Sequence, residues 1–287
     1  MLPLIFAHAN SFPAGTYSLL FEQLRARGFD VQALPRFGHD PAYPVTDNWP
    51  HLVTQLRDFA QPLVQRWGEP AFLVGHSLGG FVSLMAAAQH PELARGVLLL
   101  DSPLLGGWRA KSVLAAKHAR LVDAFSPGKI SRKRRTRWAS AQEALEHFQH
   151  KPSFARWHPQ VLQDYVRHGL HDDGQGQLTL WFTREEETAI YNSLPHNLSS
   201  LLRQHPLRCP VAFIGGRHSR EMRQVGMDMT ERVTRGRIML LDGSHLFPME
   251  QPLVTAAAIE ASLLNLQAVV SSSHTARPTA GGHPKKS

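Results

Sequence analysis

The chain of 287 residues has a single cysteine, Cys209. An intramolecular disulfide is therefore impossible, and nothing indicates an oxidising compartment, so we expect a cytoplasmic protein. No uninterrupted run of about 18 apolar residues occurs, which argues against a membrane span. The apolar start, MLPLIFAHANSF, has no basic leader and no small-residue cleavage pattern, so we interpret it as a strand rather than a signal peptide.

Metal-binding and nucleic-acid-binding motifs are missing as well. The 17 histidines are scattered, with no His-Glu-x-x-His motif and no pairing with cysteines, so we expect no metal site. The net charge is +8, and part of the excess lies in KISRKRRTR, residues 129–137. Such a run can attract an anionic polymer, but it is more often a solvated loop in an enzyme. Because no nucleic-acid fold motif accompanies it, we expect no nucleic-acid partner.

Short apolar runs alternate with longer helical patterns along most of the chain. Alternating β and α elements predict an α/β fold with a mostly parallel sheet flanked by helices. Several of the runs are apolar on both faces, which is typical of strands in such a sheet. The expected strands are residues 2–9, 29–35, 71–76, 96–102, 209–216 and 236–243. The expected helices lie near residues 15–27, 50–66, 78–89, 221–234 and 252–267.

This alternation is interrupted between residues 103 and 208. The interrupting stretch contains helix-like segments and short apolar runs, so it is too structured for a loop and predicts an inserted, mainly helical cap. The core domain then comprises residues 1–102 and 209–267. Residues 268–287 have no periodicity and little apolar content, which predicts a disordered tail.

The stretch FLVGHSLGGF, residues 72–81, places Ser77 between Gly75 and Gly79, after an expected strand and before an expected helix. At a sharp strand-to-helix turn, side chains two residues before and after the central residue would collide with neighbouring backbone, so both positions require glycine. Such a turn exposes the Ser77 hydroxyl and aims the N–H of Leu78 toward an oxyanion. The motif therefore predicts a nucleophilic serine.

The nucleophile elbow GHSLGG resembles that of the α/β-hydrolase superfamily, and FAHANSFPAGTY (6–17) and DGSHLFPMEQP (242–252) support the resemblance. It runs from about residue 2 to residue 267 and implies a serine-nucleophile, esterase-like branch with a helical cap. The chain starts at what looks like the third strand of the full fold, so the two usual leading strands are expected to be absent. Serine as nucleophile argues against the epoxide-hydrolase and haloalkane-dehalogenase branches, which carry aspartate there.

The resemblance also implies a base and a second oxyanion donor. His245 follows the last expected strand, in LLDGSHLFPME, at the family's position for the base. A serine hydroxyl is a poor nucleophile until a neutral imidazole takes its proton. The loop His8-Ala9-Asn10 corresponds to the family's oxyanion loop, which makes Asn10 the candidate donor, although alanine replaces the usual glycine.

The sequence leaves the orienting acid open between two carboxylates. In the family an aspartate commonly follows the strand that corresponds to residues 211–216, yet the chain has Arg220 there and Glu221 one residue out of register. Asp101, at the end of the preceding strand, can reach the same imidazole, and some superfamily members use that position. We favour Asp101 as the triad acid, with Glu221 as the alternative.

These features predict a serine hydrolase that cleaves a carboxylic ester, or a related acyl bond, of a small and largely apolar substrate. Such a reaction needs no metal and no organic cofactor. Acyl transfer, thioester hydrolysis and C–C bond hydrolysis stay open, because fold and triad do not determine the bond. A catalytically silent binding protein is the alternative from another class. Cap aromatics are expected to help form an apolar pocket or else the cap's own core: Trp108, Trp138, Phe148, Phe154, Trp157 and Trp181.

Overall fold

A computed structural model describes residues 1–106 and 135–275 of the chain, the last six by their backbone alone. Its centre is a six-stranded sheet in the order β2–β1–β3–β4–β8–β9, in which every neighbouring pair is parallel. The parallel sheet predicted from the sequence is thereby confirmed. The strands are β1 (Leu2–Ala7), β2 (Phe29–Ala33), β3 (Ala71–His76), β4 (Ala94–Leu100), β8 (Val211–Gly216) and β9 (Ile238–Leu241).

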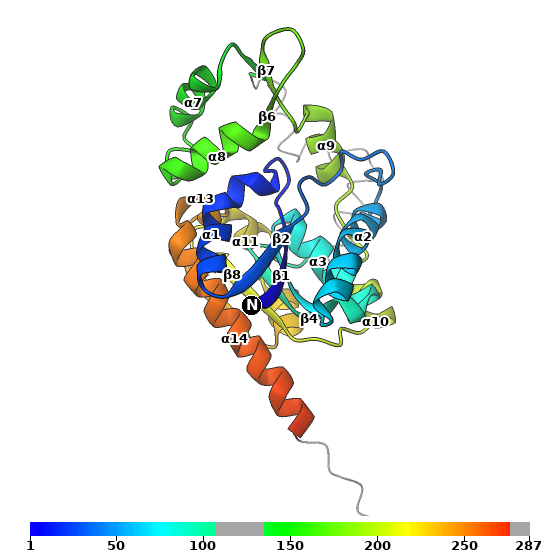
Figure 1. Cartoon of the computed structure of the whole chain (residues 1–287). Coiled ribbons are helices and arrows are strands. Elements are labelled where there is room, and N and C mark those ends of the chain that lie inside the picture. The colour runs from blue at the N-terminus through cyan, green and yellow to red at the C-terminus, as the bar shows by residue number, and fades with distance from the viewer. Residues whose placement is uncertain (107–134, 276–287) are drawn as a thin grey trace, which may run out of the picture.

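Helices cover both faces of this sheet (Figure 1). The layer formed by α1 and α14 packs on one face, and α2, α3 and α12 pack on the other. The helical elements of the core are η1 (Ala14–Tyr17), α1 (Ser18–Ala26), α2 (Pro50–Trp67), α3 (Leu78–Gln89), η2 (Pro91–Leu93), α11 (Arg220–Val225), α12 (Asp228–Thr234), α13 (Phe247–Glu250) and α14 (Pro252–Thr275). The single helix expected over residues 221–234 is two helices, because Gly226 ends α11 with a φ of 76°.

The side chains of β1 show why the strands are apolar on both faces. Leu4 and Phe6 belong to the hydrophobic cluster that includes α1 and α14. Ile5 and Ala7 belong to the cluster on the opposite face, with α2 and α3. All four side chains are fully buried. Alternate residues of a strand point to opposite faces, so a sheet with helices on both sides needs continuous apolar runs.

The described part of the predicted cap, residues 135–208, leaves the core after β4 and rejoins it before β8. Figure 1 shows α7, α8, β6 and β7 together beyond one end of the central sheet, where α8 packs on η1. The elements are β5 (Arg137–Trp138), α7 (Ala141–Gln149), α8 (Pro159–Gly169), β6 (Leu170–Asp172), β7 (Leu178–Leu180), α9 (Arg184–Asn192) and α10 (Leu198–Gln204). The segment is thus mainly helical with a three-stranded antiparallel sheet, and its status as a separate domain stays a prediction.

The aromatic residues of this segment pack mostly against one another. Phe148 and Phe154 have ring centroids 4.9 Å apart, and Phe154 and Trp157 have centroids 4.6 Å apart. Trp138 is fully buried against Phe148. These four rings therefore form the core of the segment rather than the wall of a pocket. Trp181 instead lies under the guanidinium of Arg36, and residue 108 falls outside the described residues.

The prediction of a disordered tail over residues 268–287 is wrong for residues 268–275, which belong to helix α14. The helix continues to Thr275, and the residues after it lie outside the described chain. Extending an existing helix avoids the cost of nucleation, so a segment without periodicity can still be helical. By length and composition alone, Pro252–Val269 could cross a membrane, but 44% of that window is buried in the fold. Burial of Ile259, Leu263 and Leu266 is typical of a core helix.

The basic run at residues 129–137 is described only at its end. Arg135 forms an ion pair with Glu143 of α7. Arg137 lies 3.5 Å from the Asp173 carboxylate. Both arginines thus face carboxylates of the chain itself, and residues 129–134 lie outside the described residues.

Candidate active site

Ser77 occupies a sharp turn between β3 and α3, with φ 52° and ψ −115°. A Cβ added at Gly75 would lie 2.2 Å from the backbone of Gly79, and one added at Gly79 would lie 2.0 Å from the carbonyl oxygen of Ala7. Real Cβ atoms do not approach backbone so closely, so both positions must be glycine for the turn to form. Because Gly75 and Gly79 have no side chains, the turn at Ser77 packs directly against the backbone at the end of β1.

The hydroxyl of Ser102 holds the backbone of the elbow. Its Oγ lies 2.9 Å from the carbonyl oxygen of Ser77 and 3.0 Å from that of Leu100. A Cβ at Gly80 would lie 2.1 Å from this Oγ, which accounts for the further glycine of the GHSLGG motif. The end of β4 thus supports the serine that follows β3.

His245 lies between β9 and α13 and connects Ser77 to a carboxylate. Its Nε2 is 3.1 Å from Ser77 Oγ, and its Nδ1 is 2.6 Å from Asp101 Oδ2. A carboxylate accepts hydrogen bonds, so Nδ1 carries the proton and Nε2 presents its lone pair to the serine hydroxyl. The structure thus brings together three residues that the sequence singled out, in the order serine, imidazole, carboxylate.

Asp101 follows β4 in a backbone conformation with a φ of 43° and is fully buried. It accepts hydrogen bonds from the Gly216 N–H at 2.8 Å, from Ser219 Oγ at 2.6 Å and from His245. Burial by itself raises the pKa of this carboxyl, but the hydrogen bonds from His245, Ser219 and Gly216 outweigh it and hold the pKa below its usual value. Asp101 is therefore an anion in contact with the imidazole.

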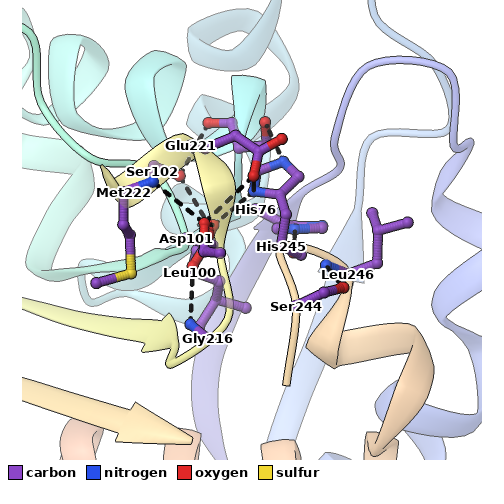
Figure 2. A network of polar contacts seen from close by, with 12 residues as sticks. His76, Leu100, Asp101, Ser102, Gly216, Glu221, Met222, Ser244, His245 and Leu246 are labelled. Carbon is purple, nitrogen blue, oxygen red and sulfur yellow. Dashed lines mark hydrogen bonds and ion pairs between the residues drawn. The ribbon is translucent and has the colours of Figure 1, made fainter. Parts of the chain in front are cut away.

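Glu221, the alternative acid, lies in the first turn of α11 on the same side of the imidazole. Figure 2 shows the carboxylates of Asp101 and Glu221 both directed at His245. Glu221 Oε2 is 3.8 Å from His245 Nδ1, beyond hydrogen-bond distance, and the side chain is 46% exposed. Asp101 therefore makes the direct contact, and Glu221 adds a solvated negative charge nearby.

These two carboxylates set the basicity of His245. Burial lowers the pKa of the imidazole, but the hydrogen bond and charge of Asp101, followed by the charge of Glu221, raise it above the usual value for histidine. The imidazolium that forms when His245 takes a proton is thus stabilised by its neighbours.

The two candidate oxyanion donors come from two neighbouring segments: Leu78 follows the nucleophile at the elbow, and Asn10 follows β1. Leu78 is the first residue of α3, where a backbone N–H has no acceptor within the helix. Asn10 lies in the turn after β1 and is 5% exposed, and its Nδ2 donates to the carbonyl oxygen of Glu187 in α9 at 3.1 Å. The side chain of Asn10 is thereby engaged, which leaves its backbone N–H as the group that could face an oxyanion.

Two other histidines near this edge of the sheet are held by backbone groups. His8 is fully buried, lies 2.8 Å from the carbonyl oxygen of Ala9 and accepts from the Phe37 N–H. His39 lies 2.9 Å from the carbonyl oxygen of Trp181. These contacts with backbone groups indicate that His8 and His39 have a structural role and are not part of the catalytic group.

Sequence reasoning missed Ser219, which donates to Asp101 and also caps α11 by accepting from the Met222 N–H. Serine is a preferred residue at the N-cap of a helix, so Ser219 in HSREM could have been predicted as the start of a helix. Its hydrogen bond to Asp101 could not be predicted, because the two residues are 118 positions apart.

Asp101, Glu221 and His245 also form a group in which one ligand atom from each residue lies within 4.8 Å of the others. Zinc and similar ions bind the lone pair of a neutral imidazole nitrogen. Here Nδ1 of His245 lies 2.6 Å from Asp101 Oδ2, so the hydrogen bond between base and acid accounts for the closeness of these two residues.

The model of the alpha/beta hydrolase family matches residues 4–258. The chain belongs to the alpha/beta hydrolase family. It is 39% identical over 79 residues to the chloroplastic pheophytinase of Arabidopsis thaliana, a match that covers 27% of the chain and 16% of that protein. It is 29% identical over 129 residues to the monoglyceride lipase of Rattus norvegicus, covering 43% of each chain. The chain thus matches less than half the length of these curated relatives.

Solved structures of other hydrolases show the same fold. The structure of E-2-(acetamidomethylene)succinate hydrolase has a TM-score of 0.68 and 21% identity, with 91% of each chain covered. The thioesterase domain from the curacin biosynthetic pathway has a TM-score of 0.69 and 17% identity, with 90% of each chain covered. At these identities the similarity shows the fold, and the alpha/beta hydrolase architecture predicted from the sequence is confirmed.

Proposed function

We propose that this alpha/beta hydrolase cleaves a carboxylic ester, or a related acyl bond, of a small and largely apolar substrate through an acyl-enzyme on Ser77. One observation carries the proposal: His245 lies within hydrogen-bond distance of Ser77 Oγ on one side and of the Asp101 carboxylate on the other. A nucleophile, a base with its lone pair toward the nucleophile, and a buried carboxylate behind the base are the parts that acyl transfer to serine requires.

In the first half of the reaction His245 Nε2 removes the proton of Ser77 as Oγ attacks the substrate carbonyl. The negative charge that develops on the carbonyl oxygen is stabilised by the N–H groups of Leu78 and Asn10. Asp101 stabilises the imidazolium without taking its proton. When the tetrahedral intermediate collapses, the imidazolium gives that proton to the leaving alcohol, and an ester bond to Ser77 remains.

In the second half water takes the place of the alcohol. His245 removes a proton from the water as its oxygen attacks the acyl carbon, the same N–H groups hold the oxyanion, and the proton returns to Ser77 Oγ as the carboxylic acid leaves. The cycle restores the starting protonation states and requires no cofactor.

An ester as substrate is supported by the lipase among the relatives, and a thioester by the structural similarity to a thioesterase domain. Acyl transfer or C–C bond hydrolysis would use the same three residues. We propose hydrolysis over acyl transfer because hydrolysis requires only water as the second substrate, and an ester over the other bonds because lipases are among the relatives matched in sequence. A panel of p-nitrophenyl esters, thioesters, lactones and diketones, assayed with one enzyme preparation, separates these reactions.

Ser77→Ala tests the mechanism. A fluorophosphonate probe should label the wild type at Ser77 and leave the variant unlabelled, and turnover of any active ester should fall by about 10³-fold or more. Ser83→Ala is the matched control, because Ser83 is buried in α3, the helix that follows Ser77, and its hydroxyl has no partner among the described residues. Turnover within tenfold of the wild type in Ser77→Ala would refute the serine mechanism, and an unlabelled wild type would favour a silent binding protein.

A further inference from the structure

His76, the residue before the nucleophile, lies fully buried between Tyr17 and the base. Its Nδ1 is 2.7 Å from the hydroxyl oxygen of Tyr17, and its Nε2 is 2.9 Å from the carbonyl oxygen of His245. The Tyr17 oxygen in turn accepts from the N–H of Ala9 at 3.2 Å. These contacts connect the loop of the second oxyanion donor with the loop of the base.

The chemistry of the end groups determines the direction of every hydrogen bond in this connection. The carbonyl of His245 can only accept, so Nε2 of His76 carries a proton and donates it. In a neutral imidazole Nδ1 then holds a lone pair and accepts from the Tyr17 hydroxyl. The N–H of Ala9 can only donate, and it fills an acceptor position on the Tyr17 oxygen. The hydrogen bonds run in one direction, from Ala9 through Tyr17 and His76 to His245.

His76 must be neutral for this arrangement to hold. Burial, followed by the nearby charge of His245, lowers the pKa of His76 to about 3. Burial likewise raises the pKa of the Tyr17 hydroxyl, which therefore keeps its proton. Both groups thus stay in the protonation states that the contacts require throughout the neutral range.

The two ends of the connection are the two backbone segments that must be placed relative to Ser77. Ala9 precedes Asn10, so the hydrogen bond to Tyr17 holds the turn that would present the Asn10 N–H to an oxyanion. The carbonyl of His245 belongs to the base itself, so the hydrogen bond from His76 holds the backbone from which the imidazole extends. His76 is the last residue of β3 and Ser77 follows it directly, so the end of one strand places both the nucleophile and the side chain that spans these segments.

We propose that Tyr17 and His76 are positioning residues that hold the oxyanion turn and the base loop in a common frame with Ser77. This inference rests on the proposed function, since it assigns the two residues a part in that reaction. Apolar residues of the same size would fill the space but would leave the buried Ala9 N–H and the His245 carbonyl without these partners, which destabilises both segments. Tyr17 and His76 satisfy both groups and connect them.

Tyr17→Phe tests the oxyanion side with little change in shape. We expect kcat to fall about tenfold with KM nearly unchanged, because the N–H of Asn10 acts on charge that appears only in the transition state. Tyr43→Phe is the matched control, since it removes a tyrosine hydroxyl that donates to Asp58 on the surface. That control should keep the wild-type kcat.

Two substitutions of His76 separate the two halves of the connection. The amide nitrogen of Gln can take the place of Nε2 and keep the bond to His245, whereas the amide oxygen of Asn can take the place of Nδ1 and keep the bond to Tyr17. His76→Gln should therefore cost nothing further in a Tyr17→Phe background, since both remove the same link. His76→Asn should lower kcat in either background, because it frees the base loop.

Each kcat is referred to the concentration of fluorophosphonate-reactive sites, and thermal midpoints are measured in parallel, so that a loss of folded protein is not read as a loss of rate. Lower thermal midpoints with an unchanged kcat per site would reduce Tyr17 and His76 to packing residues and overturn the inference. Equal additive losses for His76→Gln and His76→Asn would also overturn it. If Ser77→Ala retains activity, the proposed function fails independently of these variants.

Discussion

The carboxylate of Asp101 accepts a 2.6 Å hydrogen bond from Nδ1 of His245, although the two residues are 144 positions apart. This contact comes about because Asp101 follows β4 and His245 follows β9, and both strands run in the same direction through one parallel sheet. The carboxyl ends of parallel strands meet at one edge, so residues distant in sequence converge there.

The direct contact of Asp101 and the longer distance of Glu221 predict opposite outcomes for their amide variants. Asp101→Asn should lower kcat by about 10⁴-fold, since the imidazole loses its orientation and its counter-charge. Glu221→Gln is the matched control and should keep kcat within about threefold, because the solvated carboxylate lies beyond hydrogen-bond distance. Steady-state kinetics on one ester measures both. A large loss in Glu221→Gln alone would move the acid to α11.

Ser77 and His245 act in one step, so their losses should not add. His245→Ala should reduce turnover about as far as Ser77→Ala, and the double variant should be hardly slower than either single variant. Single-turnover rates with an activated ester provide the measurement. Additive losses would mean that His245 works in a different step from Ser77.

The raised pKa of His245 predicts the acid limb of the pH–rate profile. Catalysis requires the neutral imidazole, so kcat/KM should rise with pH through a midpoint above the ordinary histidine value of about 6.5. Glu221→Gln removes one of the charges that raise this pKa, and its midpoint should move to lower pH. A midpoint that is unchanged in Glu221→Gln would show that this carboxylate has no electrostatic effect on the base.

Two buried neutral histidines should weaken the fold in acid. The pKa of His8 is lowered to about 4 and that of His76 to about 3, chiefly by burial, whereas both titrate near 6.5 when unfolded. Their contribution is thus complete above pH 6.5 and is lost as the pH falls toward 4, with a slope of up to about 1.4 kcal/mol per pH unit for each histidine. His245, whose pKa is raised, is protonated in both states below 6.5 and adds no slope there.

Urea unfolding at several pH values between 7 and 4.5 checks this expectation. The His76→Gln variant should lose about half of the slope, since one of the two titrating groups is gone. A slope equal to that of the wild type would show that His76 is not held neutral in the folded chain.

The elbow can be tested by adding a single methyl group. Gly79→Ala places a Cβ 2.0 Å from the carbonyl oxygen of Ala7, so we expect a loss of at least about 3 kcal/mol in unfolding free energy. Gly96→Ala in β4 is the comparison, because its Cβ would meet only side-chain atoms of Phe72 and Leu266, at 3.1–3.2 Å. Equal losses in the two variants, measured by urea unfolding, would contradict the geometric account of the motif.

The sheet and the elbow were predictable because their determinants are local. Apolar runs, their spacing and the glycines around Ser77 act within about ten residues, and each has a steric cause. The sequence left two candidates for the triad acid, Asp101 and Glu221. The choice between them depends on the distance between Glu221, in the first turn of α11, and the imidazole of His245. The contacts of His76 with Tyr17 and His245 were out of reach, as they join residues 59 and 169 positions apart.

Strands β4 and β8 are neighbours in the sheet but are separated in the chain by the whole of the predicted cap. The hydrogen bond from the Gly216 N–H to Asp101 therefore joins residues 115 positions apart. Closing a loop of that length costs about 4 kcal/mol of chain entropy before any contact offsets it. The strands β1 to β4 are continuous in sequence and leave the ribosome first, so we expect them to fold before β8 can join. The hydrogen bonds on Asp101 then form last. During refolding, catalytic turnover should therefore appear only once β8 has joined the sheet, whereas the turn at Ser77 can form before that.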